Sequence, residues 1–237
     1  MVDVEPWKNN PKHNWVYNKV LLCDLQNVKW WPCPIEPTYP SIVRPIFNLS
    51  GMGGGVKKVN NLEEFKESNC YGFFSTPFIE GKHTSHDFRV VDGEFFDETI
   101  FIGYPIKKHI GAFLYWELLY KKRIPVLSDN MKRLQTKLIG YTGPLNVECI
   151  DNTIIEVHLR EGDVDLLKDE YSVPLFIVPI WGTIGDNTEI DIENVKTQSG
   201  VIDVLEDSSN MAGTGLYLKR KALVITKKLP NNIHRSL

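Results

Sequence analysis

Residues that favour β-strands recur in short runs along the chain, separated by polar or glycine-rich stretches. Asp92-Gly93 lies between two such runs and is a strong signal for a two-residue hairpin turn. The middle of the chain is therefore predicted to be antiparallel β-sheet. Strands are predicted at 39–49, 56–59, 72–79, 88–91, 94–96, 145–150, 154–159, 173–180 and 216–226.

Helices are predicted in fewer places. Asn60 or Asn61 can cap a short helix whose early carboxylates suit the positive end of the helix dipole. Ser128 or Asp129 can cap a longer helix with apolar residues on one face. Together with the strands, and without any internal repeat, these helices predict an α+β protein. The predicted helical segments are 16–25, 62–65, 112–122 and 128–139.

Length and composition fit a folded globular protein. With 237 residues, 42% of them hydrophobic, the chain can form one large domain or two small lobes. Lys and Arg number 27 against 30 Asp and Glu, which gives a formal net charge of −3. The chain therefore lacks the cationic excess that drives binding to phosphate backbones, and no nucleic-acid partner is expected.

The cysteines and the apolar segments bear on the cellular compartment. The four cysteines, at 23, 33, 70 and 149, form no C-x-x-C pair, so neither a zinc ribbon nor a thioredoxin-like centre is indicated. No apolar run approaches the roughly 20 residues that cross a bilayer, and the N-terminal residues are polar. The expectation is a cytoplasmic protein with reduced thiols and no membrane partner.

The segment 145–160 is predicted to form a hairpin with one polar face. A two-residue turn at 151–152 would place Glu156 opposite Val147 and mix polar and apolar groups on both faces. A three-residue loop at 151–153 instead pairs Glu148 with Glu156 and Asn146 with His158. The other face is then uniformly apolar, formed by Leu145, Val147, Cys149, Ile155, Val157 and Leu159.

Two carboxylates directly opposite each other repel and need a counter-charge. A divalent cation provides one, because hard oxygen ligands suit Mg²⁺ or Mn²⁺, and Arg160 at the end of this face could contact a phosphate that shares the metal. An ordinary solvated hairpin, in which Arg160 or a lysine pairs with the acids, explains the same residues. The hairpin alone leaves both interpretations open.

Two other segments contain candidate functional residues. His83-x-x-His86-Asp87 contains potential metal ligands, but residues 83 and 86 of one strand face opposite ways, which disfavours a metal site. The stretch 175–185, with Pro179 and Trp181, is either a wall of a substrate site or a loop over a buried tryptophan.

The order of these segments resembles the ATP-grasp superfamily over about residues 15–162. Glu148 followed by Glu156-Val157-His158-Leu159-Arg160 is similar to the family's metal hairpin, an acidic strand before a Glu-x-Asn-x-Arg strand. Residues 39–46 resemble the strand that ends in a phosphate-binding lysine before proline. Residues 51–56 resemble the flexible glycine-rich loop, and Phe78-Ile79-Glu80-Gly81 the linker between lobes. Asn18-Lys19 is similar to an early Asp-Lys pair.

The resemblance implies an ATP-grasp fold, with two α+β lobes whose antiparallel sheets close on a nucleotide. The expected parts are an N-terminal arm and helix at 1–40, a small lobe at 41–80, a larger lobe at 81–162 and a C-terminal extension at 163–237 packed on the core. The N-terminal α/β domain that usually accompanies the fold is not expected. A homodimer or partner subunit could supply the acceptor site instead.

The resemblance also implies roles for individual residues in binding ATP. The phosphates are expected to contact Lys19, Arg44 and the three glycines Gly53, Gly54 and Gly55, whose backbone N–H groups are unobstructed. Arg44 in place of lysine keeps the charge and can bind phosphate bidentately. The base and ribose are expected to contact Pro77, Phe78, Ile79 and His83.

The implied metal ligands are Glu148 and Glu156, with His158 where the family usually has asparagine. Imidazole binds hard Mg²⁺ less well than an amide oxygen does, so His158 is expected to favour Mn²⁺, bind phosphate or pair with Asn146. Asn146 could supply the oxygen that His158 lacks. Arg160, with Arg44 the expected catalytic residue, would stabilise the γ-phosphate or an acyl phosphate.

The activity implied by the resemblance is that of an ATP- and Mg²⁺-dependent ligase. It would activate the carboxylate of a small molecule or peptide as an acyl phosphate for attack by an amine or a thiol. Two alternatives share the fold: a nucleotide-binding regulatory protein without turnover, and a kinase that phosphorylates a hydroxyl or phosphate. The sequence does not identify the substrate.

Overall fold

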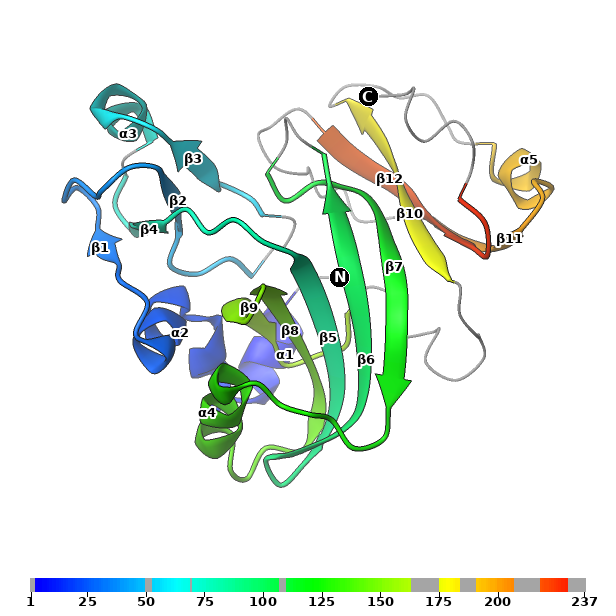
Figure 1. Cartoon of the computed structure of the whole chain (residues 1–237), viewed down its shortest axis with the longest axis horizontal. Helices are drawn as coiled ribbons and strands as arrows, with labels where there is room; N and C mark the ends of the chain where they lie inside the picture. Colours follow the sequence, from blue (N-terminus) through cyan, green and yellow to red (C-terminus); the bar gives the residue numbers. More distant parts are fainter. Residues whose placement is uncertain are drawn as a thin grey trace.

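The computed structural model describes residues 3–49, 53–68, 70–106, 110–162, 175–183, 191–206 and 218–229, arranged as two antiparallel sheets with helices beside them (Figure 1). The α+β class is confirmed. The helices are α1 (Val4–Asn9), the 3-10 helix η1 (Asn14–Tyr17), α2 (Lys19–Gln26), α3 (Leu62–Ser68), α4 (Asp129–Lys137) and α5 (Ile192–Lys196). The strands are β1 (Trp31–Pro32), β2 (Ser41–Pro45), β3 (Lys57–Val59), β4 (Phe73–Pro77), β5 (His83–Val91), β6 (Glu94–Pro105), β7 (Phe113–Lys122), β8 (Gly143–Ile150), β9 (Thr153–His158), β10 (Phe176–Thr183), β11 (Val201–Glu206) and β12 (Leu218–Thr226).

The smaller sheet has the strand order β1-β4-β2-β3. Helix α3 covers it, and Val43, Val59 and Phe65 form its buried core. The helix begins where the sequence predicts, because Asn61 Oδ1 accepts a hydrogen bond from the Glu64 backbone N–H at 2.9 Å. Glu64 in turn accepts from the Asn60 backbone N–H at 2.8 Å, which ties the residue before the cap to the first turn.

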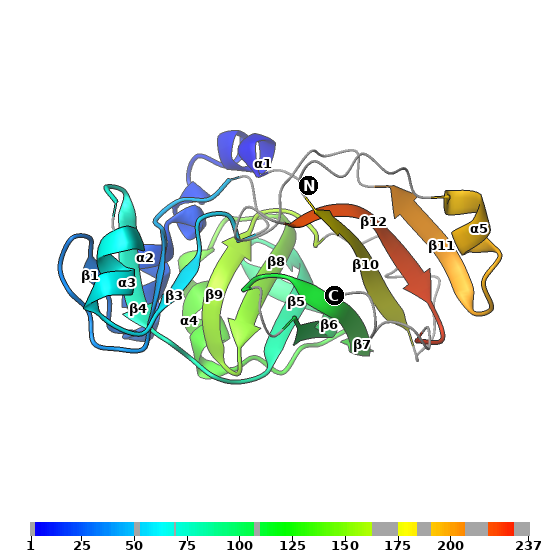
Figure 2. The ribbon, with the colours of Figure 1, turned by 90° about the horizontal axis from the view of Figure 1, so that it is seen from above.

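The larger sheet has eight strands in the order β11-β12-β10-β7-β6-β5-β8-β9. The Asp92-Gly93 turn between β5 and β6 is confirmed, with φ values of 49° and 86°. Strand β10 pairs with β7, so the C-terminal strands β10 to β12 continue the same sheet (Figure 2). Helix α5 lies against β11 at the far edge.

The main core lies where η1, α2 and α4 pack against the hairpin end of the larger sheet. Helix α4 confirms the predicted cap and face: Ser128 Oγ accepts from the Met131 N–H at 3.3 Å, and Met131, Leu134 and Leu138 are buried. None of the described helices is long and apolar enough to cross a membrane.

The predicted helix at 112–122 is wrong, because these residues form strand β7 between β6 and β10. Phe, Tyr and Trp occupy four of the first eight positions from Phe113 to Tyr120, and aromatic side chains pack well on a pleated surface. Tyr115 stacks on Tyr104 of the neighbouring strand with 4.3 Å between ring centroids. Cross-strand packing of this kind favours a strand over the predicted helix.

The hairpin of β8 and β9 has the predicted pairing but a different turn. Glu148 lies opposite Glu156 and Asn146 opposite His158, as the sequence predicts. The three-residue loop is wrong: Ile150 pairs with Thr153 across a two-residue turn, and a bulge between Glu148 and Cys149 restores the register. The bulge also changes which side chain reaches the core, because Ile154 and not Ile155 belongs to the buried cluster.

Strand β9 is an edge strand whose backbone is covered by two side chains. Gln26 of α2 donates to the Ile154 carbonyl at 2.9 Å and accepts from the Ile154 N–H at 2.6 Å. Arg44 of β2 donates through Nη1 to the Ile155 carbonyl at 3.0 Å. These bonds satisfy part of the open edge and tie α2 and the smaller sheet to the hairpin.

Candidate active site

A cavity of about 270 Å³ lies between the two sheets. Of the residues that the sequence singled out for nucleotide, metal or catalysis, it gathers all except Gly54 and Gly55. Those that line it are Lys19, Arg44, Gly53, Pro77, Phe78, Ile79, His83, Asn146, Glu148, Glu156, His158 and Arg160. Residues from α2, β2, β4, β5, β8 and β9 therefore share one cavity, which is larger than a single water or ion requires.

The polar face of the hairpin offers a group of three potential metal ligands. One ligand atom each of Glu148, Glu156 and His158 lies within 4.8 Å of the others. Ligands of one octahedral Mg²⁺ at 2.1 Å are at most about 4.2 Å apart, so small side-chain movements would bring the three together around an ion. Two carboxylates and an imidazole fit a divalent cation in charge and chemistry.

Each of the two facing carboxylates has a partner of opposite charge or a hydrogen-bond donor. Lys19 Nζ lies 2.8 Å from Glu156 Oε1, an ion pair outside hydrogen-bond geometry. His83 Nε2 lies 3.0 Å from Glu148 Oε2. Burial raises the pKa of Glu156, but the charges of Lys19 and His158 outweigh it and leave that pKa lowered, so the carboxylate is ionised at neutral pH.

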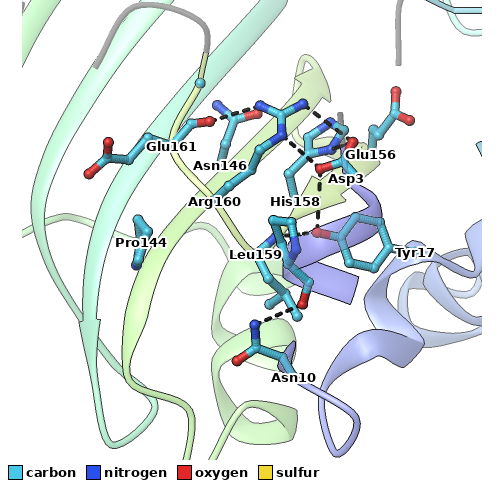
Figure 3. A network of polar contacts seen from close by, with 12 residues as sticks. Asp3, Asn10, Tyr17, Pro144, Asn146, Glu156, His158, Leu159, Arg160 and Glu161 are labelled. Atoms are coloured by element: carbon cyan, nitrogen blue, oxygen red, sulfur yellow. Dashed lines mark hydrogen bonds and ion pairs between the residues drawn. The ribbon is translucent and has the colours of Figure 1, made fainter. Parts of the chain in front are cut away.

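Asp3 was not predicted as a functional residue, yet it organises one side of the cavity (Figure 3). Its side chain is fully buried and accepts from His158 Nδ1 at 3.0 Å and from Arg160 Nε at 2.7 Å. Tyr17 donates to the same carboxylate at 3.4 Å. Burial raises the pKa of Asp3, while hydrogen bonding and charge from His158, with Arg160 adding to both, lower it overall. No local sequence signal marks a lone acidic residue of the N-terminal segment for this role.

Arg44 reaches the cavity from the smaller sheet. Its guanidinium packs over the Phe74 ring, with Cζ 5.1 Å from the ring centroid. Burial lowers the pKa of this guanidinium, although the nearby Cys23 and Glu156 oppose that effect. Arg44 Nε is buried and finds no hydrogen-bond acceptor among the described residues. A buried donor without a partner is what an anionic ligand such as phosphate would satisfy.

The glycine-rich loop falls only partly on the described residues, since 50–52 lie outside them. Gly53 lines the cavity and has a φ of 61°, a left-handed conformation that favours glycine. Gly55, with φ 78°, faces Phe73: a Cβ there would lie 3.2 Å from the ring. Gly54 does not line the cavity. Phosphate binding by the loop remains a prediction for all three glycines.

The segment between the two sheets contributes an apolar wall. Pro77, Phe78 and Ile79 line the cavity where β4 leads into β5. The Phe78 N–H donates to the Pro40 carbonyl at 3.0 Å, and Lys58 Nζ lies 3.7 Å from the centre of the Phe78 ring. This wall has the flat, apolar character that suits a purine base.

Asn146 is buried beside the metal-ligand group, and its amide N–H groups are already engaged. Nδ2 donates to Ser85 Oγ at 2.8 Å and to Asp87 Oδ1 at 3.0 Å. Asp87, a buried acid, also accepts from the Gly162 N–H at 2.7 Å. These bonds leave the Asn146 carbonyl oxygen as the atom that could bind a ligand.

The far end of the cavity is formed by the C-terminal strands. Pro179 and Trp181 of β10, together with Arg220 of β12, line it next to Phe113. Trp181 Nε1 donates to the Phe113 carbonyl at 2.9 Å. Trp181 is thus partly buried and lines the cavity, but it lies on strand β10 and not under a loop; residues 184 and 185 lie outside the described part.

His83 and His86 face opposite sides of the sheet, as the strand period predicts. His83 lines the cavity, whereas His86 Nδ1 lies 3.0 Å from Glu98 Oε1 on the other face. Within the described residues, the hairpin triplet is the one group of His, Cys, Asp and Glu with metal-site spacing. The structure therefore gives no support to a His83–His86 metal cluster.

The fold is shared with several solved structures. An L-amino acid ligase from Bacillus licheniformis matches with a TM-score of 0.62 and 14% identity, over 93% of this chain and 69% of that chain. A carboxyaminoimidazole ribonucleotide synthase from Aspergillus clavatus, complexed with ATP, matches with a TM-score of 0.59 and 9% identity, over 90% of this chain and 68% of that chain. The biotin carboxylase domain of a Hydrogenobacter thermophilus 2-oxoglutarate carboxylase, crystallised with MgADP, matches with a TM-score of 0.52 and 12% identity. The match covers 90% of this chain and 62% of that chain.

Sequence comparison adds no closer relative: no protein-family model and no curated protein matches the chain. At identities of 9–14%, the structural likenesses establish the fold, and function has to be argued from the site.

Proposed function

Because this chain has the ATP-grasp fold, we propose that it is an ATP-dependent ligase that activates a carboxylate as an acyl phosphate for attack by an amine or a thiol. One observation carries the proposal: the cavity between the sheets brings two facing carboxylates, Glu148 and Glu156, together with the cations Lys19, Arg44 and Arg160. The charge pattern suits a metal-bound polyphosphate. The solved neighbours that bind ATP or MgADP support the choice of nucleotide.

The nucleotide would lie with its base against the apolar wall and its phosphates toward the hairpin. Pro77, Phe78 and Ile79 form the base wall, where the Pro77 carbonyl can accept from the adenine amino group. His83 would contact the ribose, at the expense of its bond to Glu148. The buried Arg44 Nε would then donate to a phosphate oxygen.

Glu148 and Glu156, with His158, would hold Mg²⁺ or Mn²⁺. The ion would supply charge neutralisation at the phosphates. Without the ion, Lys19 pairs with Glu156 and His83 with Glu148, which offsets the repulsion between the two carboxylates, so the hairpin is assembled before the ion binds. This preorganisation is the contribution of the chain itself.

Phosphoryl transfer would then depend on positioning and fixed positive charge. An oxygen of the substrate carboxylate attacks the γ-phosphorus, the bond to the β-phosphate oxygen breaks, and ADP leaves. The amine or thiol next attacks the acyl carbon, loses its proton and expels phosphate. Arg44 and Arg160 would stabilise the negative charge that spreads over the transferred phosphoryl group.

The carboxylate substrate, a small molecule or peptide, would lie at the far end of the cavity. Phe113, Pro179 and Trp181 make this end apolar, and Arg220 adds positive charge. A second copy or a partner subunit would complete the acceptor surface. The activity named for the Bacillus licheniformis neighbour, an L-amino acid ligase, agrees with a carboxylate–amine reaction.

A nucleotide-binding protein without turnover is the second candidate, and the Asp3 network favours it. Arg160 is bound through Nε and Nη2 to Asp3 and through Nη1 to the Glu161 carbonyl. An arginine engaged in this way has less freedom to follow a phosphoryl group during transfer. A kinase on the same fold is a third possibility that the cavity charges alone do not separate from a ligase.

Hydroxylamine trapping separates the three functions. The protein is incubated with ATP, Mg²⁺ and pools of amino or aliphatic carboxylic acids, with and without hydroxylamine, and ADP and hydroxamate are measured. A ligase releases ADP and forms hydroxamate, because hydroxylamine attacks the acyl phosphate. A kinase given pools of alcohols or phosphates releases ADP with a stable phosphorylated product. A regulatory protein binds ATP without releasing ADP.

Variants link any turnover to this site. Glu156→Gln is expected to abolish ADP release, whereas Glu94→Gln, which removes an exposed carboxylate on β6, should leave it unchanged. ADP release that survives Glu156→Gln would show that the hairpin is not the metal site.

A further inference from the structure

His158 is held in one orientation by groups from the N-terminal segment. Its Nδ1 lies 3.0 Å from Asp3 Oδ2, and both side chains are buried, with 4% and 0% of their surface exposed. A carboxylate accepts hydrogen bonds, so Nδ1 is the protonated nitrogen of the imidazole. A ligating imidazole has to be neutral, and in the neutral ring with its proton on Nδ1 the lone pair that can bind a metal is on Nε2.

The position of Asp3 is itself fixed by several hydrogen bonds. Its second carboxylate oxygen accepts from Arg160 Nε at 2.7 Å, and its backbone N–H donates to the Leu49 carbonyl at 2.9 Å. Its carbonyl accepts from the Trp7 N–H at 2.9 Å, which ties it to the start of helix α1. The carboxylate that orients His158 is thus fixed by both its backbone and its side chain.

The arrangement has the form of a carboxylate–histidine–metal relay, in which an outer carboxylate sets the tautomer and raises the basicity of a ligating imidazole. One ring nitrogen of His158 and one carboxylate oxygen each of Glu148 and Glu156 lie within 4.8 Å of one another, and Nδ1 is already bound to Asp3. The donor set is therefore two oxygens and one nitrogen. An imidazole donor adds more to a first-row transition-metal ion than to Mg²⁺, which prefers oxygen ligands throughout.

We propose that Asp3 is a positioning residue that makes His158 a nitrogen ligand of the metal, and that the site consequently selects Mn²⁺ over Mg²⁺. The inference rests on the proposed function, because it assumes that a metal–nucleotide complex occupies the hairpin. It extends that function by giving the N-terminal segment a role in choosing the cofactor ion.

The primary measurement is pulsed electron paramagnetic resonance of Mn²⁺ bound to the protein with ATP. Direct coordination by imidazole gives a coupling to nitrogen-14, which oxygen ligands alone do not produce. The wild-type protein is expected to show this coupling, and His158→Asn to lose it. His86→Asn is the matched control, since it removes a histidine from the opposite face of the same sheet and should retain the coupling.

Asp3→Asn tests the positioning role. An asparagine amide can donate to Nδ1 and thereby place the proton on Nε2, which cannot then bind a metal. We expect loss of the nitrogen coupling and a fall in Mn²⁺ affinity of about ten- to a hundredfold, with little change for Mg²⁺. Tyr17→Phe, which removes a neutral hydrogen bond to the same carboxylate, should keep both.

Two results would overturn the proposal: bound Mn²⁺ without nitrogen coupling in the wild-type protein, or unchanged coupling in folded Asp3→Asn. If Asp3→Asn does not fold, nitrogen-15 chemical shifts of metal-free wild-type protein decide the tautomer, and a proton on Nε2 would contradict the account. Calorimetric titration of ATP in parallel distinguishes failure of the proposed function from failure of the metal selectivity. Absent nucleotide binding contradicts the proposed function, whereas intact binding with equal Mg²⁺ and Mn²⁺ affinities contradicts only the selectivity.

Discussion

Lys19 and Glu156 form an ion pair that joins the first residue of helix α2 to strand β9, with Nζ 2.8 Å from Oε1. The helix begins at this lysine because Asn18 Oδ1 accepts from the Val20 and Leu21 N–H groups at 3.0 and 3.3 Å. The exposed fractions of the two side chains are 6% and 18%. The pair thus lies largely out of solvent, at the point where helix, hairpin and cavity meet.

Removing one partner of this pair should destabilise the fold. In Lys19→Met, Glu156 keeps its burial and loses its nearest cation, and we expect the free energy of unfolding to fall by about 3 kcal/mol. Lys132→Met is the control, because Lys132 and Asp129 pair at 3.3 Å with 62% and 91% of their side chains exposed. It should cost under about 1 kcal/mol in urea unfolding. Equal decreases in the free energy of unfolding of the two variants would show that burial of the Lys19–Glu156 pair does not add to its effect on stability.

The Asp3 network predicts how stability depends on acid. The folded-state pKa of Asp3 lies below its ordinary value of 3.8, so the folded protein binds fewer protons there than the unfolded chain. The stabilisation is present above about pH 4 and is lost as the pH falls through the folded pKa. The free energy of unfolding, measured in urea between about pH 5 and 3, should therefore change less steeply with pH in Asp3→Asn than in wild-type protein. Asp129→Asn, at an exposed site, should keep the wild-type slope; an unchanged slope in Asp3→Asn contradicts the account.

Alanine substitutions at two glycines distinguish the cost of backbone strain from the cost of a close contact. Gly55 and Gly72 have φ values of 78° and 81°, so alanine at either position costs about 1 kcal/mol in backbone strain. At Gly55 the new Cβ would also lie 3.2 Å from the Phe73 ring, whereas at Gly72 nothing lies within 4 Å. Gly55→Ala should therefore lower the unfolding free energy more than Gly72→Ala in the same denaturant titration. The reverse order would indicate a different loop conformation.

Thiol reactivity should follow burial. Burial, with a smaller effect from Glu148, raises the pKa of Cys149 to about 12, while Cys70 is exposed. At about pH 8, iodoacetamide should modify Cys70 in the native protein and leave Cys149 unmodified until urea is added. Peptide mass spectrometry after timed quenching measures both sites. Comparable native rates at the two cysteines would place Cys149 outside the core.

The hairpin pairing was predictable from sequence because a strand period of two leaves few registers that segregate polar from apolar residues. Only one of the registers considered put Glu148 opposite Glu156, and the structure has it. The bulge near Ile155 was not predictable, since a two-residue turn with a bulge and a three-residue loop give the same downstream pairing. The predicted site residues that meet in one cavity were identified by motif order along the chain.

Other features needed the tertiary structure. Strand β7 was mistaken for a helix because its apolar residues are nearly continuous, and a buried strand and a helix then look alike. The role of Asp3 depends on its contact with Arg160, which is distant in the sequence, so it could be recognised only in the folded structure. The same holds for Arg220, which reaches the cavity because β12 joins the larger sheet.

Isothermal titration of ATP, with and without Mg²⁺, into wild-type protein and Glu156→Gln tests the central claim most directly. The account predicts metal-dependent binding to the wild-type protein that weakens at least about tenfold in Glu156→Gln, with Glu94→Gln as an unaffected control. Circular dichroism confirms that each variant is folded. Absence of ATP binding to the wild-type protein under any metal condition would contradict the account and leave the hairpin as an ordinary charged sheet face.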